Sequence, residues 1–414
     1  MVRFPVEKTD FYLIFIGGLS AILTASFQAY QTILSFRFFG GLLLGLFGIV
    51  LFFLLGKYCE STSRRLILLG SFYLIIAYLA WPNRTFWLDW HDQGYYFRML
   101  SEMANGFLTA ENFRYGIGYP ILAIPFYPLI GEDALFIPNL IAFVGTIYLS
   151  FNIFRSLSDD LTAKLATLLL IFGTTFTYHH IIWWSHGIVI FCFLLTANIS
   201  LKKKIDNKAL LLVGFVVGYS FFTRYVEVII FLPLIVFIIW RKKLKALALI
   251  AIGAAPMIFA TFFAHWIVFG NPLMTPYGVE FGQAQYFLIE NIPQNIFFTF
   301  FYYPANMALG DPAVGILKFP VLIWAFFFIF APLGMYRALK NQSEKLQKGF
   351  IIAAVFSIIL CVFYSSAYFQ FHSGSFGPYP ADFRYILPSF PFLAFFSTIG
   401  LLSYIRLKDK NKKS

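Results

Sequence analysis

"LDWHDQGYYFRMLSEMANG", residues 88–106, is the most polar stretch in the first half of a chain that is otherwise rich in Phe, Leu and Ile. Asp92 stands where an acid commonly caps a helix, and Gly106 stands where a helix commonly stops. The stretch therefore predicts a short amphipathic helix that lies in a membrane interface with Asp92 at its entrance. Its apolar stripe recurs at helical spacing, at Tyr95, Tyr96, Met99, Leu100 and Met103.

The composition around this stretch indicates a polytopic membrane protein. Of 414 residues, 60% are hydrophobic and 12% are charged, and the mean hydropathy is +0.76, which excludes an ordinary soluble domain. We predict a single all-α integral membrane domain over 1–414, because an open sheet cannot satisfy its edge hydrogen bonds in lipid. About twelve apolar runs are long enough to be considered spans of a hydrocarbon core of roughly 30 Å. They lie near 11–29, 39–56, 65–81, 134–154, 163–178, 183–200, 208–222, 226–240, 245–269, 319–336, 349–369 and 385–405.

The distribution of charge predicts the orientation. Most of the 31 Lys and Arg residues fall in short turns such as 202–204 and 241–245, and positively charged turns stay in the cytoplasm. Both termini are therefore predicted to be cytoplasmic, in a multi-pass protein of the bacterial inner (cytoplasmic) membrane. The net charge of +12 then reflects topology and attraction to anionic membrane lipids. Nucleic acid is not an expected partner, because the lysine runs are short and stand at helix ends.

The acidic residues gather on the other side of the membrane. They concentrate in two long loops, 82–133 and 270–318, and in the short loop 370–384. Function concentrates in long loops because short turns merely connect. The working surface is therefore predicted to be extracytoplasmic.

A second short segment follows the first in the loop 82–133. The apolar run 119–130 is too short to span a bilayer and contains Pro120, Pro125 and Pro128. We interpret it as a second interfacial segment. The loop would then form the floor of a cavity between lipid and water, which suits a substrate with a lipid tail and a polar head.

These residues resemble the GT-C membrane glycosyltransferases, which include protein O-mannosyltransferases and the lipid A aminoarabinose transferase. "WHDQGYYFRMLSEMANG" (90–106) and "FRYGIGYPILAIPFYPLIG" (113–131) are similar to the first external loop of that group. "GYSFFTRYVEVIIFLPLIVFI" (218–238) is similar to its arginine-bearing helical hairpin. "SGSFGPYPADFRYILPSFPFLAF" (373–395) is similar to an ending seen in bacterial members. The resemblance thus touches most of the chain, although each motif is degenerate.

The resemblance implies transfer of a sugar from a polyprenyl-phosphate-linked donor to a glycan, lipid or protein acceptor on the extracytoplasmic face. Asp92 matches the position of the family's catalytic acid. Many members have a second acid directly after the first, whereas here Gln93 follows Asp92 and the other acid is Asp89. Either Asp89 or Asp92 could therefore be the base that takes the proton of the acceptor hydroxyl.

A departing phosphate needs cations near it more than it needs a general acid. Arginine clamps phosphate oxygens in bidentate fashion, while each basic residue alone could also be an interfacial anchor. Tyr115 stands beside Arg114 in the "FRYGIGYP" motif and is predicted to bind substrate with it. The external basic residues that flank the motifs are Arg114, Arg224, Lys318 and Arg384.

The histidines of "TYHHIIWWSHG" (177–187) allow two further interpretations. His186 is a candidate for binding sugar or phosphate, because "SHG" resembles a pair seen in bacterial members. A divalent metal site built from His179, His180 and His186 is conceivable, but the spacing matches no ligand motif and an aromatic belt is the commoner meaning. No metal ligand or cofactor is assigned.

Two other classes of function share this composition. A flippase or transporter for lipid-linked glycans would carry ionisable residues in the middle of its spans, whereas the acids here cluster at one face. A polymerase or ligase for lipid-linked glycans with a related fold is the nearer alternative. Both remain open on the sequence alone.

Overall fold

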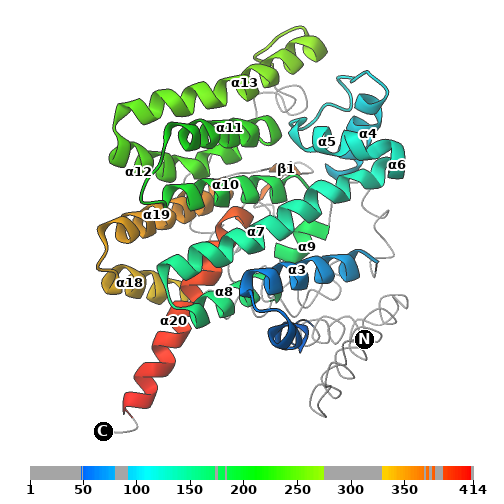
Figure 1. Cartoon of the computed structure of the whole chain (residues 1–414). Coiled ribbons are helices and arrows are strands. Elements are labelled where there is room, and N and C mark those ends of the chain that lie inside the picture. The colour runs from blue at the N-terminus through cyan, green and yellow to red at the C-terminus, as the bar shows by residue number, and fades with distance from the viewer. Residues whose placement is uncertain are drawn as a thin grey trace.

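The computed structural model describes residues 48, 50–79, 92–172, 176–181, 184–274, 329–367, 370–372, 375–377 and 386–411 (Figure 1). The described part is helical almost throughout, which confirms the predicted all-α class. Its one sheet is a small antiparallel hairpin in which Phe371 pairs with Phe376. The hairpin comprises β1 (Gln370–His372) and β2 (Ser375–Gly377) and lies in the short loop predicted at 370–384.

Most of the longer described helices overlap apolar runs of the sequence. The longer ones are α3 (Thr62–Leu79), α7 (Phe136–Leu157), α8 (Asp160–Phe172), α10 (His186–Ser200), α11 (Asn207–Thr223), α12 (Leu232–Lys242), α13 (Leu244–Phe269), α18 (Ala331–Asn341), α19 (Lys345–Ala367) and α20 (Phe390–Asn411). The shorter ones are α4 (Asp92–Ala104), α5 (Gly118–Ala123), α6 (Tyr127–Ile130) and α9 (Phe176–Ile181). Single turns of 3₁₀ helix lie at Ile124–Phe126, Gly131–Leu135, Glu227–Phe231 and Leu387–Ser389.

Four helical runs in the described part are long and apolar enough to cross a membrane, and two apolar helices are shorter. The four are Gly118–Leu157, Leu244–Phe269, Lys345–Phe363 and Leu387–Ile405, and the two are His186–Ser200 and Asn207–Thr223. The predicted span at 11–29 and most of the one at 319–336 lie outside the described residues. The number of about twelve spans therefore stays a prediction.

The amphipathic helix expected after Asp92 is present as α4. It begins at Asp92 and ends at Ala104, and Gly106 adopts a positive φ of 83° just beyond it. Tyr96, Met99 and Leu100 of the predicted stripe are completely buried. The carboxylate of Glu102 accepts hydrogen bonds from the segment that follows, at Thr109 and Asn112, and so folds it back onto the helix.

The proline-bearing segment 119–130 is more closely joined to the next helix than the sequence suggested. Short turns from Gly118 onward continue into α7, so that a run of helical turns extends from Gly118 to Leu157 with a bend at Gly131, whose φ is 61° and ψ is −142°. Pro125 and Pro128 stand at the start of their turns and Pro120 is the third residue of α5, so each lies in a first turn, where its missing N–H is not needed. In Figure 1, α4, α5 and α6 lie together at one end of the molecule.

Helices α11 and α13 touch through their backbones. A Cβ atom on Gly214 would lie 2.0 Å from the carbonyl oxygen of Ile250, and one on Gly253 would lie 2.2 Å from that of Leu211. Gly218 makes the same kind of approach to Ala254. Gly214 and Gly218 are four residues apart and form the small-residue pattern by which helices associate closely in membranes.

The basic turns meet at the end of the molecule opposite α4. Arg241 at the end of α12 donates hydrogen bonds to the carbonyls of Ser200, Lys202 and Lys203 in the α10–α11 turn. Gln342 and Gln347 donate to carbonyls of the α7–α8 turn. The basic turns predicted to be cytoplasmic therefore share one face, as their topology requires.

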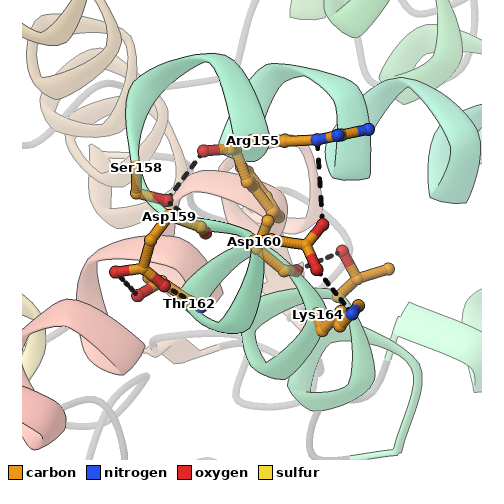
Figure 2. Close-up of polar contacts among 9 residues, drawn as sticks. Arg155, Ser158, Asp159, Asp160, Thr162 and Lys164 are labelled. Atoms are coloured by element: carbon orange, nitrogen blue, oxygen red, sulfur yellow. Dashed lines mark hydrogen bonds and ion pairs between the residues drawn. The ribbon is translucent and has the colours of Figure 1, made fainter. Parts of the chain in front are cut away.

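Figure 2 shows how the α7–α8 turn is closed. Asp159 caps α8 by accepting a hydrogen bond from the Thr162 amide at 2.8 Å, and Ser158 Oγ donates to the Phe154 carbonyl. Asp160 lies 2.5 Å from Lys164 Nζ and 3.7 Å from Arg155 Nε. The Arg155 and Asp160 side chains are 62% and 45% exposed, respectively.

The orientation can be tested by chemical labelling of single cysteines. In a Cys59→Ser background, Asn105→Cys should react with a membrane-impermeant thiol reagent in intact cells, because Asn105 is exposed just beyond α4. Lys204→Cys, exposed at the opposite end, should react only after lysis. Cys192 and Cys361 are buried and should not react with the reagent. The reverse pattern would place α4 in the cytoplasm and contradict the predicted topology.

Candidate functional site

The structure brings five of the predicted site residues to the α4 end of the molecule. Arg114 and Tyr115 lie between α4 and α5, His186 begins α10, and Arg224 ends α11. Asp92 is the first residue of α4. Asp89, Lys318 and Arg384 lie outside the described residues.

Two glycines allow the "RYGIGYP" segment to touch the end of α11. A Cβ atom on Gly116 would lie 2.5 Å from the carbonyl oxygens of both Phe222 and Thr223. One on Gly118 would lie 2.4 Å from Thr223 Oγ1. Any larger residue would push the two segments apart, so these glycines fix Arg114 and Tyr115 beside Arg224.

Aromatic rings fill the space between α4 and this segment. Tyr96 is completely buried, with its ring centroid 5.2 Å from that of Tyr115 and 5.0 Å from that of Tyr119. The guanidinium of Arg114 lies 4.1 Å from the ring centroid of Tyr95, in a cation–π contact. Arg114 and Tyr115 are therefore part of an aromatic wall built on α4.

A chain of buried polar groups leads from α4 to the end of α11. The Tyr96 hydroxyl lies 2.6 Å from Ser185 Oγ, and Arg224 Nη1 donates to the same Ser185 oxygen at 3.4 Å. Arg224 Nε lies 2.5 Å from Glu227 Oε1, and His186 Nδ1 lies 2.8 Å from that oxygen. One carboxylate thus joins two predicted site residues that are far apart in the sequence.

Every member of this Arg224–Glu227–His186 cluster is buried. Their side chains are exposed by 8%, 2% and 0%, respectively. A charge buried at this depth is stable only with a partner that compensates it. Glu227 is that partner, and sequence reasoning missed its role because it stands inside an apolar run that was interpreted as a span.

Gln93, next to Asp92, is a second buried polar side chain at this end. It is 1% exposed, and among the described residues neither its amide oxygen nor its amide nitrogen has a hydrogen-bond partner. A buried amide without a partner costs free energy, which a bound polar group can recover. Gln93 therefore marks the start of α4 as a place where a ligand could be held.

The described residues hold no metal site of the ordinary kind. No group of three or more His, Cys, Asp and Glu side chains in the described ranges lies close enough to bind a metal ion. His180 instead packs against Phe143 and Phe176, and its Nδ1 lies 2.8 Å from the Phe176 carbonyl oxygen.

An apolar groove adjoins the polar cluster. It has a volume of about 500 Å³ and lies between α5, α7, α10 and α11, with Phe126, Ile141, Phe191 and Phe215 among its lining residues. Tyr219 also lines it, stands just over one helical turn before Arg224, and donates a hydrogen bond to the Gly118 carbonyl. The groove thus reaches the part of α11 that precedes Arg224.

Comparison with known proteins identifies the fold. No family model matches the chain, and no curated protein sequence matches it. The crystal structure of ArnT from Cupriavidus metallidurans bound to undecaprenyl phosphate is similar over 82% of this chain, with a TM-score of 0.54 and 14% identity. The apo structure of the same protein is similar over 75%, with a TM-score of 0.50 and 15% identity.

The chain spans 60% and 55% of the length of those two structures. At this identity the likeness concerns the arrangement of helices alone. It agrees with the resemblance that the motifs indicate, and the chain has the GT-C membrane fold seen in the aminoarabinose transferase ArnT.

Proposed function

We propose that the chain is a membrane glycosyltransferase that moves a sugar from a polyprenyl-phosphate-linked donor to an acceptor on the extracytoplasmic face. The observation that carries the proposal is the buried Arg224–Glu227–His186 cluster, which lies between the apolar groove and the helix that begins at Asp92. A lipid phosphate needs this combination of an apolar channel and a cation. A neighbour of the same fold was crystallised with undecaprenyl phosphate, which supports the choice of donor.

The residues take the following roles in this proposal. The prenyl chain lies in the groove, and Arg224 binds the phosphate, whose negative charge grows as its bond to the sugar breaks. Asp92, or Asp89 before it, takes the proton from the acceptor hydroxyl as that oxygen attacks the anomeric carbon. Arg114, Tyr115, Lys318 and Arg384 complete the binding of the substrates. The acceptor is a glycan, a lipid or a protein of the cell envelope.

The proposal can be tested with purified protein and radiolabelled polyprenyl-phosphate sugars. We expect label to pass from the lipid to a component of a cell-envelope extract, and to stay on the lipid when the extract is omitted. A flippase would instead move the labelled lipid across vesicles without forming a product. A polymerase or ligase would consume a lipid-linked glycan but leave the monosaccharide donor unused. Either result would contradict the proposal.

A further inference from the structure

We propose that the opposite end of the molecule carries a binding site for an anionic glycerophospholipid. The site joins a basic pocket at the end of α12 to an apolar groove between α12 and α19, which would hold the headgroup and an acyl chain, respectively. It lies on the face predicted to be cytoplasmic and is separate from the Arg224–Glu227–His186 cluster.

The basic pocket has a volume of about 520 Å³. Its charged lining residues are Lys203, Arg241, Glu344 and Lys345, so three cations face one carboxylate. Among the described residues, no carboxylate lies within ion-pair distance of any of the three cations. The pocket therefore offers uncompensated positive charge to an anion.

Contacts within the chain hold the wall of this pocket in place. Arg241 donates hydrogen bonds to the carbonyls of the α10–α11 turn, which anchors Lys203 beside it. Lys345 Nζ lies 5.3 Å from the ring centroid of Trp240. The cations come from three separate elements, so their meeting is a property of the fold and not of one basic run.

The apolar groove between α12 and α19 begins where the basic pocket ends. It has a volume of about 480 Å³ and is lined by Val236 and Trp240 of α12 and by Ile352 and Phe356 of α19, among others. Trp240 lines both spaces and is 59% exposed. Tryptophan is enriched at the level of lipid headgroups, where its ring meets acyl chains and its N–H meets water.

Charge complementarity selects the occupant of the groove. A zwitterionic lipid would fill the groove but would leave the excess positive charge unmatched, whereas an anionic phosphodiester satisfies both parts. Two lysines near an anionic headgroup are together worth on the order of tenfold or more in affinity. A phospholipid already resides in the membrane at this depth, so it reaches the groove by lateral diffusion.

Native mass spectrometry of the full chain in detergent can test the site. Wild type should bind phosphatidylglycerol about tenfold or more tightly than phosphatidylcholine with the same acyl chains. The exposed pair Lys203→Gln/Lys345→Gln should lower phosphatidylglycerol binding to the level of phosphatidylcholine. Lys242→Gln/Lys348→Gln removes the same charge from the same end outside the pocket and should leave the preference unchanged.

A second pair of variants tests the groove. Ile352→Trp should fill it and weaken the binding of phosphatidylglycerol, while Ile359→Trp, exposed on the same helix but outside the groove, should not. Equal binding of the two lipids by wild type would overturn the proposal. So would equal losses in the two lysine pairs, which would indicate only diffuse surface charge. Undecaprenyl phosphate could also displace phosphatidylglycerol from the wild type and fail to bind Lys203→Gln/Lys345→Gln. That result would assign the site to a prenyl lipid and refute the phospholipid proposal.

Discussion

Asp92→Asn is expected to abolish measurable sugar transfer while protein yield and thermal stability stay near those of wild type. Asn occupies the start of a helix about as well as Asp does, so α4 should keep its boundary at residue 92. What is lost is the carboxylate that takes the acceptor proton, and general base catalysis contributes typically about 10²–10⁴-fold. Turnover of radiolabelled donor, measured beside a melting curve, separates the two effects.

The matched control for Asp92→Asn is Glu111→Gln. Glu111 is an exposed acid of the same loop, and its change removes one negative charge without altering α4. It should keep wild-type turnover. If Asp92→Asn were as active as Glu111→Gln, Asp92 would be a helix cap only, and a dead Asp89→Asn would then move the base to Asp89.

Glu227→Ala is expected to destabilise the protein strongly. It leaves Arg224 and His186 buried without the carboxylate that lies 2.5 and 2.8 Å from them. Breaking a buried ion pair by removing one partner typically costs about 3–5 kcal/mol. The melting temperature in detergent should fall clearly. Glu227→Gln keeps the shape of the side chain and should therefore be more stable than Glu227→Ala. It should still need more lipid donor for half-maximal rate, because the charge that holds Arg224 in place is lost.

The α7–α8 turn supplies a control in which one carboxylate also lies between two basic side chains. Asp160 also lies close to two basic side chains, Arg155 and Lys164 (Figure 2). Its own side chain is 45% exposed. Exposed ion pairs contribute about 1 kcal/mol or less, so Asp160→Ala should change the melting temperature little and the donor dependence not at all. Equal effects of Asp160→Ala and Glu227→Ala would show that burial of the cluster is unimportant.

Local patterns predicted those parts of the site whose structure depends on residues close together in the sequence. The 3.6-residue spacing from Tyr95 to Met103 and the stop at Gly106 give α4 without reference to any other helix. The short basic turns likewise predicted their shared face, because topology alone brings them together. Arg224 of "FFTRYVE" was predicted as a site residue because it stands in a motif similar to one of the GT-C glycosyltransferases.

The partner of that arginine could not be predicted in the same way. Glu227 follows Arg224 by three residues, a spacing common to many surface pairs, and this spacing alone does not show that the pair is buried. His186 reaches Glu227 only because α10 and α11 pack side by side. The contacts of Asp89, Lys318 and Arg384 lie outside the described residues, so their roles stay predictions.

The glycines of α11 and α13 determine the direction in which the Arg224 side chain points. An α-helix turns by about 100° per residue, so a slip of one residue along the α11–α13 contact would turn the end of α11 and point the Arg224 guanidinium away from Ser185. Gly214, Gly218 and Gly253 prevent that slip, because only at these positions can the opposing carbonyls come so close. The orientation of the Arg224 guanidinium thus depends on glycines, which have no side chain. One of them, Gly214, lies ten residues before Arg224 in the chain. A larger residue at Gly214 would misdirect the site without touching it.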